Sequence, residues 1–391
     1  MSNKEIDFLL QKAVADIGIP GIVAIVANED DILYEAAFGQ IGKGSRQAIS
    51  LDTVFWIASM TKTITTIAAL QLVENGLIHL HEPINKVLPE IDFLSVLDGY
   101  DDDGNPILRK SESPITLHHL LTHTAGFTYD MWNEDIVRYA SEKQIPGIIL
   151  CQNETLEKTP LVFDAGKRWE YGISIEWAGK VVEAVSGQTL RDYMLEHILL
   201  PLGMNDTDFI LKEEQRSRLA IMHVRDENGR LHAIDFEVTQ QPEFFMGGGG
   251  LYSTAGDYIK FLQMLLNNGT LNDVQIIQPE TVKMMMSNQI GELNVQPMIT
   301  AIPSSTNNVN FFPGIIKKWG YGFMITTEDV PEGRRAGSLA WAGLGNTYFF
   351  LDPTEKVAAV FLTQILPFAD EDVLDVFSQL EEGIYNHLLG K

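Results

Sequence analysis

Residues 53–78 read TVFWIASMTKTITTIAALQLVENGLI, and this stretch carries the strongest signal in the sequence. Apolar residues occupy most sides of its helical period up to Asn75 and Gly76, which predicts a buried helix beginning at Ser59. Ser59 and Lys62 stand three residues apart, so both side chains lie on one face of that helix and can meet. A serine and a lysine at the start of a buried helix indicate a site rather than ordinary core.

The Ser59–Lys62 pair has two interpretations. In the structural one, Ser59 only caps the helix and Lys62 extends to solvent. In the chemical one, apolar neighbours deprive the charged form of Lys62 of solvation, and its pKa falls from ~10.4 towards neutrality. A neutral Lys62 can take the proton of Ser59 and make that serine a nucleophile.

Composition limits the class of protein. A chain of 391 residues is longer than a single hydrophobic core usually supports, so we expect two lobes. No apolar run reaches the ~18 residues of a membrane span. The 53 acidic and 28 basic residues give a net charge of -25, which repels nucleic acids and anionic membrane surfaces, so neither is an expected partner.

The N-terminus and the cysteine content carry two further expectations. Glu5 and Asp7 stand where a secretory signal has basic residues, and we expect a cytoplasmic protein. The single cysteine, Cys151, has no partner for a disulfide or a structural zinc site. We therefore expect Cys151 to be a small core or surface residue.

The two ends of the chain show the same kinds of pattern, a predicted hairpin and a predicted helix. Apolar runs separated by turn signals predict one hairpin over 21–27 and 32–39 and another over 348–351 and 357–363. Helical spacing occurs over 4–18 and again from Val373 to Leu388. Residues 1–75 and 290–391 are therefore predicted to form one α/β lobe, an antiparallel sheet with helices on both faces.

The middle of the chain, 76–289, is predicted to form a mainly helical lobe, with the segment around Tyr171 at the cleft. Helical patterns cover 115–123, 175–186, 189–199 and 256–267. Residues 97–113 include Asp101 to Pro106, and by composition we expect a surface loop there.

Several motifs in order resemble one superfamily. S-x-x-K near the N-terminus is typical of penicillin-binding proteins and serine β-lactamases. The segments GLIHLHEPINKVLPE, ITLHHLLTHTAGF and FFMGGGGLYSTAGDYIKFLQMLLNNG resemble that superfamily along residues 12–365. Ser59-Met-Thr-Lys62, the loop 96–127, Tyr171 and Trp341-Ala342-Gly343 look more narrowly like the family VIII carboxylesterases.

The resemblance implies a β-lactamase/transpeptidase-like fold and roles for further residues. Tyr171 matches the tyrosine that stands beside the serine and lysine, although Ile173 replaces the asparagine of the Tyr-x-Asn pattern. Trp341-Ala342-Gly343 replaces Lys-Thr-Gly, so the cation that pairs a substrate carboxylate is missing. Trp341 and Gly343 are the expected substrate-binding residues, and the backbone N–H groups of Ser59 and Leu344 the expected oxyanion donors.

Other motifs are weaker. No serine has the flanking glycines of a nucleophile elbow, and Gly247 to Gly250 complete no phosphate-binding fingerprint. His118, His119 and His123 lack the HExxH carboxylate, so we expect capping or packing roles and no metal. No cofactor is expected either.

The sequence therefore predicts a serine hydrolase that cleaves small, short-acyl carboxylic esters through a Ser59 acyl-enzyme, with Lys62 and Tyr171 moving the proton. The alternatives are a β-lactamase or D-alanyl peptidase, an acyltransferase that uses the same acyl-enzyme, or a catalytically silent binding relative.

Overall fold

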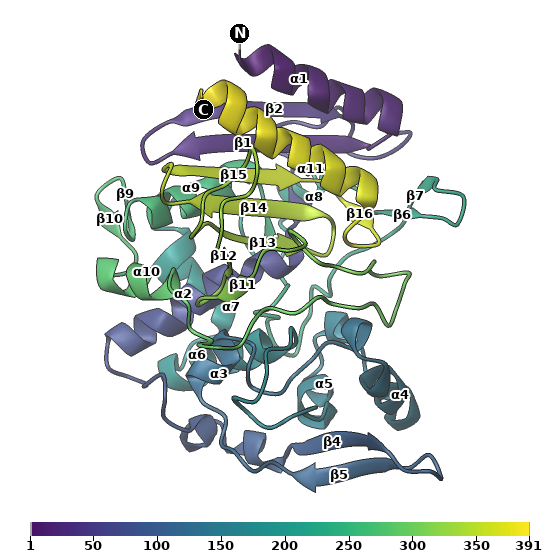
Figure 1. Cartoon of the computed structure of the whole chain (residues 1–391), viewed down its shortest axis with the longest axis vertical. Coiled ribbons are helices and arrows are strands. Elements are labelled where there is room, and N and C mark those ends of the chain that lie inside the picture. Colours follow the sequence, from purple (N-terminus) through teal and green to yellow (C-terminus); the bar gives the residue numbers. More distant parts are fainter. Residues whose placement is uncertain (1, 391) are drawn as a thin grey trace.

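The computed structural model describes residues 2–390, and a seven-stranded sheet organises one end of the molecule (Figure 1). The strand order is β11-β12-β13-β14-β15-β1-β2, and every neighbouring pair is antiparallel. In chain order these strands are β1 (Gly21–Asn28), β2 (Ile32–Gly39), β11 (Lys317–Trp319), β12 (Met324–Thr326), β13 (Leu339–Gly343), β14 (Thr347–Asp352) and β15 (Val357–Leu362).

The two ends of the chain meet inside this sheet. β1 pairs with β15, with Val23 opposite Leu362, so the first and the last predicted hairpins lie side by side. Both hairpins are confirmed. The antiparallel sheet predicted from both chain ends is therefore present.

Helices cover both faces of the sheet, as predicted. α1 (Ser2–Lys12) and α11 (Glu371–Gly383) lie on one face, and α9 (Ala255–Leu266) lies on the other (Figure 1). Adjacent residues of β14 reach both layers, since Tyr348 stacks on Phe377 of α11 and Phe349 contacts Tyr258 of α9. α9 falls within 76–289 of the sequence, yet it packs against β1 and β15 and so belongs with the sheet.

The second lobe is mainly helical and lies below the sheet in Figure 1. Its helices are α3 (Leu117–Leu121), α4 (Glu134–Lys143), α5 (Asn153–Lys158), α6 (Ser174–Ser186) and α7 (Leu190–Met194).

The prediction of a surface loop over 97–113 is wrong. β4 (Ser95–Tyr100) and β5 (Pro106–Lys110) form an antiparallel hairpin there. Only the turn is as acidic as the composition suggests, with Asp101 accepting from the backbone N–H of Asp103 and of Asn105. Ile107 and Leu108 are 45% and 43% exposed, so these strands lack the buried alternating face that predicts a strand from sequence.

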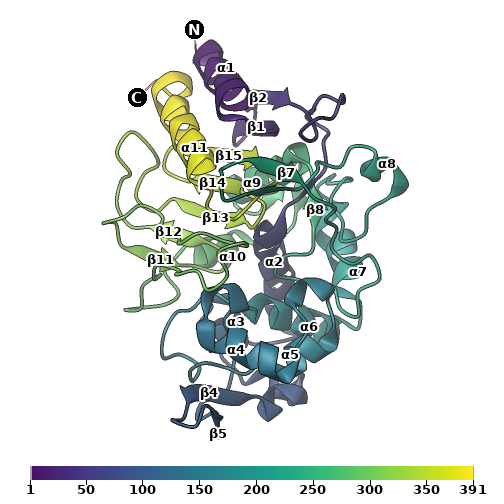
Figure 2. The ribbon, with the colours of Figure 1, turned by 90° about the vertical axis from the view of Figure 1, so that its right-hand side faces the viewer.

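The helix expected to begin at Ser59 begins two residues later. α2 (Thr61–Glu74) follows a short 3-10 turn, Ala58–Met60, that contains Ser59. Twelve consecutive residues of α2, from Thr61 to Leu72, are buried, because α2 lies in the centre of the molecule between sheet and helical lobe (Figure 2). Because α2 is buried on all sides, its sequence has no charged stripe of the kind that a surface helix turns to solvent.

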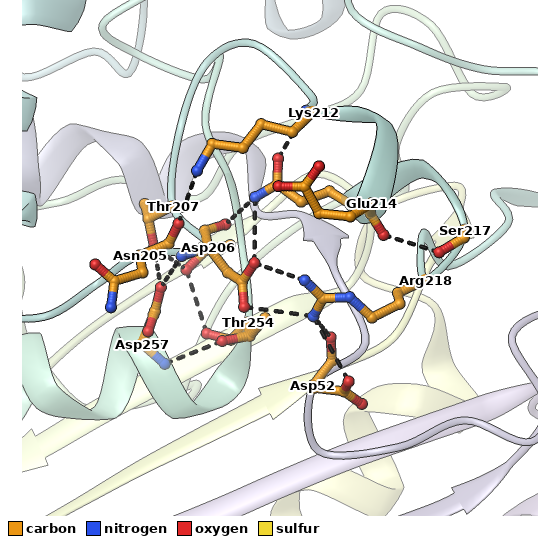
Figure 3. A network of polar contacts seen from close by, with 12 residues as sticks. Asp52, Asn205, Asp206, Thr207, Lys212, Glu214, Ser217, Arg218, Thr254 and Asp257 are labelled. Atoms are coloured by element: carbon orange, nitrogen blue, oxygen red, sulfur yellow. Dashed lines mark hydrogen bonds and ion pairs between the residues drawn. The ribbon is translucent and has the colours of Figure 1, made fainter.

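A polar network lies beside the strand pair that contains the segment before this turn (Figure 3). β3 (Phe55–Trp56) pairs with β8 (Tyr252–Ser253), and β8 leads directly into Thr254, which caps α9 by accepting from the backbone N–H of Asp257. The Asp257 carboxylate accepts from the N–H of Asp206, and the Asp206 carboxylate pairs with Arg218 at 2.6 Å. Arg218 also donates to the backbone carbonyl of Asp52, so this network links the segment just before β3 to the start of α9.

The remaining elements are short. They are α8 (Glu213–Arg216), α10 (Pro279–Met285), β6 (His223–Arg225), β7 (Leu231–Ala233), β9 (Thr270–Leu271), β10 (Val274–Gln275) and β16 (Ile365–Leu366). Within residues 2–390, every helix is too short or too polar to cross a bilayer.

Candidate active site

Ser59 lies in a strained turn immediately before the first residue of α2. Ala58 has a φ of 43°, a left-handed conformation that residues with a side chain rarely adopt. Ala58 and Met60 are buried, whereas Ser59 is half-buried and lines a cavity. The turn therefore presents the Ser59 hydroxyl to a substrate.

Lys62 meets Ser59 as predicted. Its Nζ lies 3.0 Å from Ser59 Oγ, and it donates to Tyr129 Oη at 2.9 Å and to the Gly248 carbonyl at 2.6 Å. Lys62 is 1% exposed, and burial lowers its pKa from 10.5 to about 7, with Glu176 acting in the opposite direction. The structural interpretation fails on both counts, because Lys62 does not reach solvent and Ser59 makes no capping hydrogen bond to α2.

The structure brings Tyr171 to the same place. Lys62 Nζ lies 4.8 Å from the centre of its ring, and Tyr171 Oη accepts a hydrogen bond from Trp341 Nε1 at 3.1 Å. Burial raises the pKa of the Tyr171 hydroxyl, and its interactions with Ser59 and Trp341 oppose that rise.

Two further residues of this cluster, Tyr129 and Glu176, are not predicted from the sequence. Tyr129 Oη donates to Glu176 Oε1 at 2.9 Å, and Glu176 Oε2 accepts from the Gly248 N–H. Burial raises the pKa of both side chains. One sequence signal does exist for Glu176, a carboxylate between Ile175 and Trp177 in a helix that is otherwise apolar on that side.

The end of β13 borders the nucleophile. Trp341 and Leu344 line the cavity beside Ser59. Gly343 is not among the residues that line it; a Cβ at position 343 would overlap the carbonyl oxygen of Ile57, so Gly343 allows β13 to approach the Ser59 turn. The backbone N–H groups of Ser59 and Leu344 remain the proposed oxyanion donors.

The cavity above Ser59 holds about 270 Å³ and is mostly apolar. Among the described residues that line it, Asp130 is the only charged one, and its carboxylate accepts from the N–H of Met131 at 2.8 Å. The apolar walls come from both lobes and from the segment before β11, and include Trp56, Trp132, Ile148, Phe236, Met246, Met298, Ile302, Leu366 and Phe368.

The histidines have the packing and capping roles that were expected. His119 completes a capping box with Thr116 at the start of α3. His118 lies 2.7 Å from Tyr321 Oη, and the ring of His123 packs 4.8 Å from that of Tyr171. In the part of the chain that the structure describes, no three His, Cys, Asp or Glu side chains are grouped to hold a metal ion.

Cys151 is a small buried residue, one of the two positions expected for it. Burial raises the pKa of its thiol to about 12, which is the opposite of what a nucleophilic cysteine needs.

A buried lysine beside an accessible serine, in a cleft between an antiparallel sheet and a helical lobe, defines an enzyme of the serine hydrolase and acyltransferase superfamily. Residues 6–382 match the Beta-lactamase family, so the chain belongs to that family. The predicted β-lactamase/transpeptidase-like fold is thereby confirmed.

Similar proteins include transferases and an esterase. The chain is 31% identical to monacolin J acid methylbutanoyltransferase of Aspergillus terreus, over 96% of this chain and 94% of the relative. It is 31% identical to lovastatin esterase of Penicillium rubens, over 97% of both chains. The structure of unliganded simvastatin synthase from Aspergillus terreus superposes with a TM-score of 0.84 at 30% identity, covering 98% of both chains.

Proposed function

We propose that this protein is an acyltransferase that takes a short acyl group from an ester onto Ser59 and passes it to the hydroxyl of a bulky apolar alcohol. The apolar cavity above Ser59 carries this proposal, because its walls suit an apolar acceptor as well as an acyl chain. Hydrolysis of the same ester, the activity predicted from the sequence, is the side reaction in which water takes the place of the alcohol.

Acylation follows from the geometry of the cluster. Ser59 Oγ attacks the ester carbonyl carbon while its proton passes to Lys62 Nζ, 3.0 Å away. The N–H groups of Ser59 and Leu344 stabilise the oxyanion. The bond to the leaving alcohol then breaks, and that alcohol receives the proton from Lys62 by way of the Tyr171 hydroxyl.

Deacylation reverses these steps with a new alcohol. The acceptor hydroxyl gives its proton to the Tyr171–Lys62 pair and attacks the acyl carbon, and Ser59 regains its proton as its ester bond breaks. An alcohol bound in the cavity is already positioned for attack, and such positioning corresponds to effective concentrations of ~10⁵ M or more. A bound acceptor can therefore compete with water, although water is far more abundant.

The cavity favours neutral groups. Trp341 stands where lactam-binding relatives carry a lysine, and no described residue that lines the cavity is basic. A substrate carboxylate would lose its solvation there without a partner, whereas an apolar chain gains about 25 cal/mol for each Å² that it buries. This asymmetry disfavours β-lactams and peptides ending in D-alanine.

The names of the relatives agree with this choice. One is named for the transfer of a methylbutanoyl group and another as an esterase of lovastatin, a pair that fits one site with two acceptors. We therefore propose a short, branched acyl group as the one transferred here. The motifs that resemble the family VIII carboxylesterases are compatible with this proposal, because hydrolysis and transfer share the same acyl-enzyme.

The test is a competition between two acceptors. The protein is incubated with 4-nitrophenyl 2-methylbutanoate, with and without menthol, and the menthyl ester and free acid are measured by mass spectrometry. We expect menthyl ester to exceed free acid at millimolar menthol, glycerol to have no such effect, and Ser59→Ala to form neither product. Free acid alone, from a protein that is acylated at Ser59, would replace the transferase proposal with an esterase. The absence of any acylation would favour a silent binding relative.

A further inference from the structure

The hydrogen bonds of Lys62 determine where its lone pair points. A neutral lysine has two N–H groups and one lone pair. The Gly248 carbonyl can only accept, so it takes one N–H at 2.6 Å. The Tyr129 hydroxyl donates its own proton to Glu176, so its oxygen accepts the second N–H at 2.9 Å. The lone pair is then left for Ser59 Oγ, 3.0 Å away.

Glu176 holds both groups that accept from Lys62. Its Oε1 accepts from Tyr129, and its Oε2 accepts from the N–H of Gly248, whose carbonyl accepts from Lys62. A Cβ at position 248 would overlap the Glu176 carboxylate, so only glycine permits this approach. Glu176 is 1% exposed, and a carboxylate so buried is costly unless it is hydrogen-bonded and paired.

We infer that Glu176 is a positioning residue for the nucleophile, because it fixes Tyr129 and Gly248 so that the lone pair of Lys62 faces the Ser59 hydroxyl. This inference rests on the proposed role of Ser59. When Ser59 attacks, its proton completes an ammonium on Lys62, and Glu176 stays ionised opposite that charge. Glu176 does not touch the substrate and takes up no proton.

Four other titratable groups near this cluster, His123, Tyr129, Tyr171 and Cys151, stay uncharged near neutral pH. Burial lowers the pKa of His123 well below its usual range, and Lys62 lowers it further, so the His123 ring is neutral. Burial raises the pKa of Tyr129, Tyr171 and Cys151 well above 7. Burial also raises the pKa of the Asp130 carboxyl, which lines the same cavity. Asp130 is the same in the wild type and in a Glu176 variant, so a difference between their pH dependences near pH 7 reports on the effect of the Glu176 charge on Lys62.

The experiment measures how fast a serine-directed phosphonate labels Ser59 between pH 5 and 10. Labelling needs no acceptor, so it is independent of the choice between transfer and hydrolysis. For Glu176→Gln we expect the high-pH rate to fall ~10-fold or more through loss of orientation. We also expect the acid limb to move down by ~1 pH unit, because a negative neighbour of Lys62 is removed.

Tyr129→Phe tests the same path without changing the charge. It removes one acceptor for Lys62 and leaves the bond between Glu176 and Gly248, and we expect a similar fall in the high-pH rate. The double variant should lose little more than either single one, because the two residues act as a unit. Tyr385→Phe is the matched control, since Tyr385 is also buried and donates to a buried carboxylate, Asp352 at 2.5 Å. Its labelling rate should equal that of the wild type.

Three results would decide against the inference. A folded Glu176→Gln protein with an unchanged plateau and acid limb would overturn it. If that variant does not fold, a Tyr129→Phe protein that labels at the wild-type rate would do the same. Failure of the wild type itself to label at Ser59 would overturn the proposed function first, and this inference with it.

Discussion

Two buried acid–base pairs in this protein are built differently. Arg334 and Glu381, which are 1% and 5% exposed, contact each other directly, with Arg334 Nε donating to Glu381 Oε1 at 2.8 Å. Lys62 and Glu176 are as deeply buried, but the Tyr129 hydroxyl stands between them. The first pair joins α11 to the loop before β13, and the second lies beneath the cavity.

The difference shows how one buried ion pair can stabilise the fold while another leaves its lysine free to exchange a proton. An arginine in a direct fork with a carboxylate stays protonated, and the pair acts as a fixed brace. A lysine that reaches its carboxylate only through a tyrosine keeps less of that stabilisation, so burial brings its pKa to about 7. Breaking the Arg334–Glu381 pair should therefore reduce the stability of the fold, and breaking the Lys62–Glu176 pair should reduce catalytic activity.

The largest expected effect tests whether the cluster around Lys62 is catalytic. Ser59→Ala removes the nucleophile, and we expect turnover and phosphonate labelling to fall to background while the melting temperature stays near that of the wild type, because Ser59 caps no helix. Intact-mass measurement after labelling checks this. Substantial turnover by the folded variant would end the assignment of Ser59.

A matched pair of substitutions then contrasts the two regions. Lys62→Met should reduce kcat/KM by at least ~10³-fold, because the serine and lysine act as one proton-transfer unit. Arg334→Met should instead cost ~3–5 kcal/mol of unfolding free energy by leaving Glu381 buried and unpaired, with kcat per folded molecule unchanged. Chemical denaturation and active-site titration separate the two. Equal losses of activity in both variants would erase the contrast.

Tyr171→Phe tests whether the Tyr171 hydroxyl takes part in proton transfer. We expect a loss of at least ~10²-fold in kcat/KM, the lower range for general acid–base catalysis, with little change in stability. Activity within a few-fold of the wild type would mean that the proton travels by Lys62 or water alone.

A comparison of neutral and negatively charged substrates tests the effect of the apolar cavity beside Ser59. Short-chain aryl esters should be cleaved at least ~10²-fold more efficiently than benzylpenicillin, because a carboxylate beside Trp341 has no cationic partner. The measurement is kcat/KM for both substrates on one preparation. Comparable efficiency on the lactam would promote the β-lactamase alternative.

The smallest effect is the pH dependence. Since Lys62 acts as a base with a pKa of about 7, kcat/KM should rise ~10-fold between pH 6 and 8 and then level off. Stability should respond with a definite sign. Between pH 7 and the ordinary value of 10.5 the unfolded chain binds the proton that folded Lys62 lacks, so this contribution to stability increases as pH rises through that window. Lys62→Met should remove that slope in urea titrations, and a slope that persists would trace it to other groups.

Local patterns in the sequence predict much of this arrangement. The contact between Ser59 and Lys62 is predicted by their three-residue spacing, although Ser59 lies in the turn before α2, and the pairing of the two chain ends is predicted by their apolar runs. Tyr129 and Glu176 could not be found in this way, because they approach Lys62 from 67 and 114 residues further along the chain and share no motif with it. The hairpin β4–β5 escaped prediction because its strands bury no regular face.

Gly343 gives the site an uneven tolerance to mutation. Because a side chain there would overlap the Ile57 carbonyl, any replacement must push β13 away from the Ser59 turn and part the two N–H groups proposed to hold the oxyanion. Met298 and Ile302 line the cavity from the segment before β11, where a change of side-chain size alters the space for substrate. A saturation library selected for new acyl acceptors should therefore recover many sequences at 298 and 302 and glycine alone at 343.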